Sequence, residues 1–264
     1  MRLEPPKPPH AARGLRQLRD EAERAARVQR SLLPDVTMPV GEFRLASLYR
    51  PCGTLGGDFY DLAWRPDCAM LLVADVMGHG VEAALVTMLV KAVFQETAEG
   101  TGEPGELLTQ MNARLHRIIP EYVFVAATVV RLGLEGPEIV IANAGLPYAF
   151  FLNASERRVT EVRLDGRPLG LLDGQSQSPY DVRRLSLAPA DVLLIASDGI
   201  GSVESERGAC FEDRRLRQVL AKLVGQEGRT VVDRLLARAA SFGRGRPLRD
   251  DINLIAVSRR GHET

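Results

Sequence analysis

Two kinds of hydrophobic pattern divide the chain. Over residues 11–33, apolar or small residues recur at alternating spacings of four and three, which is the heptad pattern of an amphipathic helix, and Pro34 then ends it. From Glu42 onward, apolar residues come in short runs that are typical of β-strands. The pattern therefore predicts an N-terminal helix followed by a domain of a different kind.

The heptad seam of this helix is weak. It consists of Ala11, Leu15, Leu18, Ala22, Ala25, Gln29 and Leu32. Because alanine and glutamine pack poorly in such a seam, two alternatives stay open: a coiled coil that forms a homodimer or contacts a regulator, or a surface helix packed on its own domain. The preceding residues, MRLEPPKPPH, are proline-rich and predict a flexible tip over residues 1–10.

The remaining pattern favours an α+β fold in layers. The predicted strands lie at 43–49, 59–64, 69–76, 122–131, 138–143, 148–152, 158–164, 191–197 and 252–258, and the predicted helices at 80–98, 104–118, 211–223 and 229–242. Strands come mostly in consecutive groups, which disfavours a doubly wound parallel sheet. Residues 165–180 read as a loop, and the helix at 80–98 is apolar on most faces, so we expect it to be largely buried.

Composition narrows the function classes. The chain has 264 residues, and its 34 Lys and Arg balance its 34 Asp and Glu, so nucleic acid and anionic membranes are not expected partners. Three cysteines without CxxC spacing argue against a disulfide framework or a thiolate metal site and favour a reduced, cytoplasmic compartment. The longest apolar stretch, 81–94, contains Glu82 and Lys91 and is too short for a membrane span.

Candidate chemistry is concentrated in four acidic motifs beside predicted strands. They are GGDFYD at 56–61, DVMGHG at 75–80, SDG at 197–199 and the pair Asp250-Asp251. Aspartate before glycine is most often a turn residue, but four such sites at comparable strand positions are hard to attribute to turns alone. Buried carboxylates that converge need a cation between them, and no basic motif accompanies these. Hard divalent ions favour such oxygen ligands, so the pattern predicts a metal site.

In this order, the motifs resemble those of a known family. GGDFYD, DVMGHGVEAAL, NAGLP, SDGI and RDDINLIAV are similar to the metal-dependent protein phosphatases (PPM, type 2C-like), in the bacterial SpoIIE/RsbU-type branch. The stretch VQRSLLP resembles the helical linker that precedes the catalytic domain in that branch. The resemblance implies a four-layer α/β/β/α sandwich of two antiparallel sheets flanked by helices, with a linker helix at 11–33 and a phosphatase domain over 34–264.

The resemblance also implies a centre of two Mn²⁺ or Mg²⁺ ions between the sheets. Its ligands would be Asp58, Asp75, Val76 through its carbonyl, Asp198, Asp250 and Asp251. Asp75 would bridge both ions, Asp58 would serve one site directly or through water, and Asp198 and Asp250 would bind the other. These four aspartates would be the catalytic residues. Whether Asp250 or Asp251 is the direct ligand stays open.

Several neighbouring positions are assigned other roles. The expected roles are a structural carboxylate at Asp61 that holds the first loop, a turn or helix-entry residue at His79, a buried unreactive thiol at Cys52 and a solvated strand-end arginine at Arg50. Two positions depart from the family, which often has histidine at Leu146 and threonine at Asn253. Neither position is an expected ligand.

The implied activity is that of a Mn- or Mg-dependent protein serine/threonine phosphatase. A metal-bridging water would hydrolyse phosphoserine or phosphothreonine without a phosphoenzyme. The implied substrate is a phosphorylated STAS-type anti-sigma-factor antagonist in a bacterial partner-switching pathway of the stress-response kind. The alternative is a non-catalytic scaffold that keeps the phosphatase fold for signalling.

Overall fold

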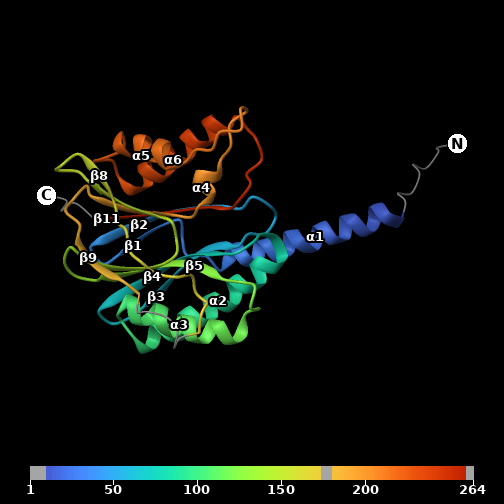
Figure 1. The fold of residues 1–264 in the computed structure, drawn as a ribbon, viewed down its shortest axis with the longest axis horizontal. Coiled ribbons are helices and arrows are strands. Elements are labelled where there is room, and N and C mark those ends of the chain that lie inside the picture. Colours follow the sequence, from blue (N-terminus) through green and yellow to red (C-terminus); the bar gives the residue numbers. More distant parts are fainter. Residues whose placement is uncertain (1–9, 174–179, 260–264) are drawn as a thin grey trace.

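The computed structural model describes residues 10–173 and 180–259. Apart from His10, the predicted flexible tip lies outside the described residues, as do positions 174–179 of the predicted loop. Within these ranges the chain forms six helices and eleven strands, beginning with a helix and ending with a strand. Figure 1 shows the strands stacked as two sheets between two pairs of helices, with the first helix extending to one side.

All strand neighbours within the two sheets are antiparallel. The six-stranded sheet has the order β1 (Thr37–Val40), β2 (Phe43–Arg50), β11 (Ile252–Arg259), β10 (Val192–Ala196), β7 (Tyr148–Asn153) and β8 (Arg158–Glu161). The five-stranded sheet has the order β3 (Asp58–Trp64), β4 (Cys68–Val76), β5 (Val125–Gly133), β6 (Glu138–Ala144) and β9 (Val182–Ser186). Side chains that alternate along each strand therefore face either the other sheet or a helix layer.

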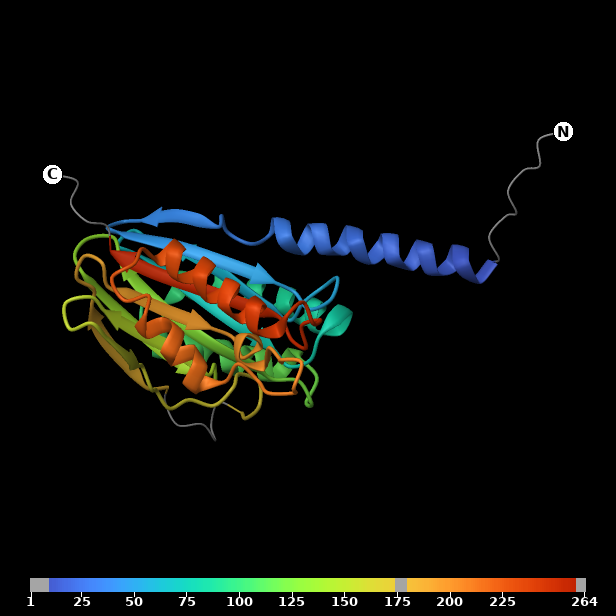
Figure 2. The ribbon, with the colours of Figure 1, turned by 90° about the horizontal axis from the view of Figure 1, so that it is seen from above.

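Helices cover the outer face of each sheet. Helices α2 (Gly80–Gly100) and α3 (Pro104–Ile118) contact the five-stranded sheet, while α5 (Asp213–Ala221) and α6 (Gly228–Gly243) contact the six-stranded sheet. Buried side chains form three apolar layers: one between α2/α3 and their sheet, one between the sheets, and one beneath α5/α6. The predicted α+β, four-layer α/β/β/α sandwich is confirmed (Figures 1 and 2).

Strands β1 and β9 and the short helix α4 (Gly199–Ser202) are not predicted from the sequence. Strands β1 and β9 lie at sheet edges, and most of their residues are not buried. Four of the five residues of β9 are exposed, and β1 contains Pro39, so neither shows the apolar run that marks a central strand. Helix α4 has only four residues, too few for a periodic pattern.

Helix α2 is buried on one side only. Its residues Ala83, Val86 and Val90 belong to the core, as predicted. A stripe at every fourth position, Val81, Leu85 and Leu89, stays 60%, 66% and 42% exposed, which contradicts the expectation of a largely buried helix. The sequence pattern could not separate the two faces, because both are apolar.

Helix α1 (His10–Ser31) combines the two alternatives of the sequence analysis. Near its C-terminal end it packs on the domain, where Ala26 and Gln29 are buried. Further toward its N-terminus it projects away from the sheets (Figure 2), and the seam residues Leu15 and Leu18 are 70% and 63% exposed. The two ends of the helix therefore differ: the C-terminal end packs on the domain, and the N-terminal part exposes apolar side chains.

We expect burial in the layer between the sheets to contribute strongly to stability. Leu71 is fully buried there, so Leu71→Ala should lower the free energy of unfolding by about 2–5 kcal/mol through lost burial and a residual cavity. The matched change Leu171→Ala, at a side chain that is 45% exposed, should cost no more than about 0.5 kcal/mol. Urea unfolding of both variants measures the difference, and equal losses would contradict this account.

Candidate metal centre

Asp58 and Asp75 face each other across two neighbouring strands. Asp58 begins β3 and Asp75 lies one residue before the end of β4, and the register pairs them directly. Side chains of such a pair lie on the same face of the sheet, about 5 Å apart at the Cβ atoms. The backbone next to them is tied as well, since Val76 N–H donates to Gly57 O at 3.1 Å. The structure thus joins two of the sequence motifs that were expected to converge.

The third motif comes from the other sheet. Asp198 follows β10 and caps helix α4, where its carbonyl oxygen accepts hydrogen bonds from Gly201 N and Ser202 N. The preceding Ser197 is buried, and its hydroxyl donates to Asp58 Oδ2 at 2.6 Å. This bond reaches from the six-stranded to the five-stranded sheet, so it holds the two sheets together at the end that carries the aspartates.

The fourth motif, just before β11, closes the cluster. Asp251 is 1% exposed, and its carboxylate accepts hydrogen bonds from Cys52 N at 2.7 Å and Gly57 N at 2.6 Å, with a longer one from Asp58 N at 3.4 Å. Asp250 is half-buried and accepts from Asp251 N at 2.8 Å. A Cβ on Gly199 would collide with Asp251 O, so only glycine allows α4 to lie this close to the strand.

The acidic side chains raise one another's pKa values. Burial raises the pKa of Asp58 well above its usual range, the charge of Asp75 raises it further, and the bond from Ser197 opposes the rise. Burial raises the pKa of Asp75 to about 7, with additional contributions from the charges of Asp198 and Asp250. Burial likewise raises the pKa values of Asp198 and Asp250. The four side chains therefore share one electrostatic environment.

No ion pair within the described residues neutralises this cluster, although the charge of His79 opposes the rise in the pKa of Asp250. Among the described residues, none of the five aspartates has an ion pair with lysine, arginine or histidine. Likewise, within 10–173 and 180–259, no three acidic, histidine or cysteine side chains already surround one point as ligands. Uncompensated carboxylates repel one another, a cation between them would relieve that repulsion, and hard divalent cations prefer oxygen ligands of this kind. The residues present are therefore compatible with Mn²⁺ or Mg²⁺.

The neighbouring positions take structural roles. Asp61 pairs with Lys91 Nζ at 2.6 Å and accepts from Gln95 Nε2 at 2.6 Å. It therefore anchors helix α2, rather than the first loop as predicted. His79 is exposed and caps α2 between two glycines with φ of +91° and +79°, which confirms the helix-entry role. Arg50 is an exposed residue at the end of β2, as expected.

Cys52 is half-buried and unsuited to nucleophilic chemistry. Burial, followed by the charge of Asp251, raises the pKa of its thiol to about 11. A thiol with this pKa is protonated at neutral pH, and only the thiolate is a strong nucleophile. This agrees with the prediction of an unreactive thiol.

The two departures from the family pattern lie in the core. Leu146 is 3% exposed and packs in the apolar layer between the sheets. Asn253 is fully buried, and its Nδ2 donates to Phe59 O at 2.9 Å, which is another bond from one sheet to the other. Its Oδ1 has no hydrogen-bond partner among the described residues. Neither position carries a charge that could contribute to the cluster.

Sequence reasoning missed two residues of this region. Ser197 stands out in the sequence only as part of the SDG motif, although a hydroxyl next to an aspartate at a strand end is a usable signal. Gln29 was counted as a seam residue, yet it binds the backbone of Gly56 beside the aspartates. A single amide in an otherwise apolar or small seam was the available hint, but it gave no indication of its partner.

Comparison with known proteins identifies the class. The family model for "Stage II sporulation protein E (SpoIIE)" matches residues 65–260. The phosphoserine phosphatase RsbU of Bacillus subtilis (strain 168) is 22% identical over 252 residues, which is 94% of this chain and 73% of RsbU. The SiaA-PP2C domain of Pseudomonas aeruginosa is 25% identical with a TM-score of 0.81, covering 94% of this chain and 99% of that one.

A further solved structure shares the fold. RsbX, in complex with magnesium, has a TM-score of 0.62 at 13% identity and covers 85% of this chain and 98% of its own. Together with the sandwich and the gathered aspartates, these likenesses define a PPM-type phosphatase. More particularly, the chain belongs to the stage II sporulation protein E (SpoIIE) family, in its SpoIIE/RsbU branch. None of the described helices has the length and apolar character needed to cross a membrane.

The raised pKa of Asp75 predicts how stability depends on pH in protein treated with EDTA. Because the folded protein binds this proton more tightly than the unfolded chain, stability should fall as pH rises from about 4 to 7, by at most about 4 kcal/mol. Asp75→Asn cannot ionise at this position, so it should make the slope smaller, while Asp58, Asp198 and Asp250 still contribute to it. Urea unfolding at a series of pH values measures it, and an unchanged slope in the variant would refute the assignment.

Proposed function

We propose that this protein is a Mn²⁺- or Mg²⁺-dependent protein serine/threonine phosphatase. The observation that carries the proposal is the gathering of five aspartates from four separate segments at one end of the two sheets, without a basic partner among the described residues. Two divalent cations held there would supply an acidified water and stabilise charge on the phosphoryl oxygens. No nucleophilic side chain is needed, which is consistent with the protonated thiol of Cys52.

The proposed ligands follow from position and partners. Asp75, Asp198 and Asp250 are less enclosed than Asp58 and interact through their charges, so we assign them to the ions together with the Val76 carbonyl. Asp58 faces Asp75 and is oriented by Ser197, which suits a direct or water-mediated contact with one ion. Both oxygens of Asp251 already accept backbone hydrogen bonds, so we assign it to holding the loop rather than to binding an ion.

The proposed substrate is a phosphorylated protein of a partner-switching pathway. RsbU is named a phosphoserine phosphatase, and this chain covers 73% of its length. By that likeness we assign to this protein a phosphoserine or phosphothreonine in a STAS-type anti-sigma-factor antagonist. Non-catalytic scaffolding is disfavoured, because all four predicted catalytic aspartates are retained and a scaffold has no use for the unfavourable charge that they concentrate.

We further propose that α1 serves as a contact for a second copy of this chain or for a regulator. The support is the free end of the helix, where Leu15 and Leu18 are exposed at seam positions. The apolar stripe of α2, at Val81 and Leu85, adds a second unpartnered surface within the described part of the chain. Apolar surface of this kind on two elements favours association.

The activity can be tested by phosphate release. Wild type should release phosphate from a phosphoserine peptide with Mn²⁺ and lose this activity in EDTA. Asp75→Asn should lower kcat by at least about a thousandfold, because it removes a charge that the ions require. Asp67→Asn is the matched control: Asp67 lies in the turn between β3 and β4, pairs with Arg131 on the surface, and should leave kcat within about twofold.

Phosphate release by the wild type that needs no metal, or the absence of phosphate release with every divalent ion tested, would overturn the phosphatase proposal. A scaffold would then be expected to keep its affinity for a partner protein after Asp75→Asn.

The contact through α1 can be tested by sedimentation. The double variant Leu15→Asp/Leu18→Asp should dissociate an assembly of the wild type, because two charges cannot be buried in an apolar seam. Gln17→Asp, on the same helix but off the seam, is the matched control and should leave the assembly intact. If the wild type is a monomer in the absence of other proteins, the homodimer is refuted. If, in addition, the chain that lacks residues 1–33 keeps the activity of the wild type, the regulator contact is refuted.

A further inference from the structure

Three arginines precede Asp250 on a segment that forms neither helix nor strand. Between α6 and β11 the chain runs irregularly over residues 244–251, and Arg244, Arg246 and Arg249 lie on this stretch. Arg249 is the immediate neighbour of Asp250, which is assigned above to the ions. An irregular segment lacks the repeated backbone hydrogen bonds of a helix or a strand, so its side-chain contacts determine much of its placement.

The backbone fixes the start of this segment. A Cβ on Gly243, the last residue of α6, would lie 2.9 Å from Val203 Cγ1, so glycine allows α6 to end close against the chain that follows α4. Arg244 then adopts a left-handed backbone with φ of +47°, and its N–H donates to Ala240 O at 3.0 Å. The other end of the segment, at Asp250, has no comparable helix to hold it.

The segment also has room to move. Arg246, Pro247 and Leu248 line one side of a hollow of about 310 Å³, and the end of β2 and helix α6 contribute to the other side through residues such as Arg50 and Leu236. A chain packed tightly on every side could not change its position, whereas one that borders a hollow can do so. Contacts of the arginine side chains therefore decide where this segment lies.

The partners of these arginines come from one loop. Residues 203–211 follow α4 and are called the α4 loop here; Phe211 N donates to Val203 O at 2.9 Å, which closes the loop on itself. Phe211 is buried, and its ring packs edge-on against that of Phe242 of α6, with 5.5 Å between the ring centroids. The α4 loop is thus anchored in the apolar layer beneath α5 and α6.

Glu204, the second residue of the α4 loop, binds two of the three arginines. Its side chain is only 12% exposed, and its carboxylate pairs with Arg249 Nη2 and, at 3.8 Å, with Arg246 Nη2. Arg246 Nη1 also donates to Ser205 O at 3.4 Å. Water screens an ion pair at a shielded carboxylate less than it screens a pair on the surface. Two guanidinium groups also compensate for the burial of this carboxylate.

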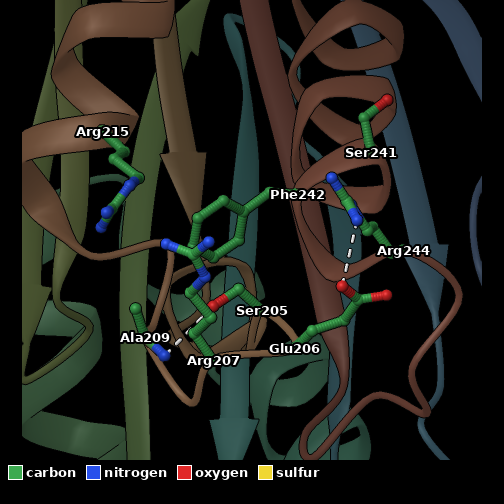
Figure 3. A pocket seen from close by; sticks show the side chains of 8 residues that line it. All are labelled: Ser205, Glu206, Arg207, Ala209, Arg215, Ser241, Phe242 and Arg244. Atoms are coloured by element: carbon green, nitrogen blue, oxygen red, sulfur yellow. Dashed lines mark hydrogen bonds and ion pairs between the residues drawn. The ribbon is translucent and has the colours of Figure 1, made fainter.

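A third pair joins the same two segments farther from Asp250 along the chain. Arg244 Nη1 donates to Glu206 Oε2 at 3.0 Å, at the rim of a hollow of about 460 Å³ (Figure 3). The side chains of Arg244 and Glu206 are 68% and 61% exposed, and such surface pairs contribute little. Glu206 therefore provides an internal comparison for Glu204: it has the same charge in the same loop, but it is not shielded.

Helix α4 connects Glu204 to the aspartate cluster. Asp198 directly precedes this four-residue helix, and Glu204 follows its C-terminal cap. At the start of the helix, a Cβ on Gly199 would collide with Asp251 O, so α4 already touches the end of the irregular segment. Glu204 adds a second attachment at the opposite end of α4. The segment that carries Asp250 is thus held to α4 at two points.

This double attachment opposes a repulsion. Burial raises the pKa of Asp250, and the charge of Asp198 raises it further, which means that the two carboxylates repel each other. Without a cation between them, this repulsion favours movement of the irregular segment away from α4. The ion pairs of Glu204 resist that movement.

We propose that Glu204 is a positioning residue for the candidate metal centre. By binding Arg246 and Arg249, its carboxylate keeps Asp250 beside Asp198, so that both can bind the same ion. The inference rests on the proposed metal site, and it concerns a residue outside the four acidic motifs. The placement of the segment can nevertheless be measured in protein without metal.

The first test is hydrogen exchange in metal-free protein. Glu204→Gln keeps the size of the side chain and removes its charge, so the fold should survive. Exchange at the amides of Arg246 and Asp251, which both donate hydrogen bonds to nearby residues, should quicken roughly tenfold. Glu206→Gln is the matched control, and it should leave both rates within about twofold of those of the wild type.

The second test is the binding of Mn²⁺ alone, measured by calorimetry. Glu204→Gln and Arg249→Gln should each weaken it by roughly tenfold, because each change releases the segment that carries Asp250. The double variant should lose little more than either single variant, since both changes break the same ion pair. A purely electrostatic influence would separate the single variants: losing the negative charge would weaken cation binding, and losing the positive charge would strengthen it.

Three results would overturn the proposal: unchanged exchange at Arg246 and Asp251 in Glu204→Gln, unchanged or tighter binding of Mn²⁺ to Arg249→Gln, or an equal effect of Glu206→Gln. Faster exchange throughout β10 in Glu204→Gln would also count against it, because it would indicate a general loss of stability. If the wild type binds no Mn²⁺, the proposed function fails, and the exchange data still decide whether Glu204 holds the segment.

Discussion

Repulsion between carboxylates governs the architecture of one end of this molecule. Asp58 and Asp75 are paired across adjacent strands, and burial raises the pKa of Asp75 to about 7. Such an arrangement is unfavourable by itself, and it persists because the sheets on either side are held together by polar bonds. Ser197 binds Asp58, Asn253 binds the Phe59 carbonyl, and each of these bonds runs from one sheet to the other. These bonds between the sheets hold the aspartates close together in spite of their repulsion.

Much of the fold could be predicted from the sequence, because central strands and core helices have strong patterns. The runs around 69–76 and 252–258 were unambiguous, since both lie in the middle of a sheet and are buried on both faces. The edge strands β1 and β9 are not predicted, for the opposite reason: residues such as Arg183 and Arg184 in β9 face solvent and carry no apolar signal. Helix α2 was misjudged, because apolar residues on its outer face cannot be told from core residues by periodicity.

The candidate site was predictable in its acidic residues but not in their supports. The five aspartates lie in four separate motifs, and the order of the motifs is informative. The contacts that organise them join positions far apart in the chain, and no local pattern encodes such pairs. Gln29 and Gly56 are 27 residues apart, and Ser197 and Asp58 are 139 apart. The partners of Asp61 could not be predicted for the same reason, because Lys91 and Gln95 lie on helix α2, far along the chain from β3.

The place of β11 in its sheet has a consequence for biosynthesis. This strand lies between β2 and β10, so the six-stranded sheet stays split into two pieces until residues 252–259 have left the ribosome. Asp251, which holds Gly57 from 194 residues away, arrives at the same moment. Assembly of the aspartate cluster therefore follows synthesis of all the other described strands, and a nascent chain that lacks this segment cannot complete the cluster.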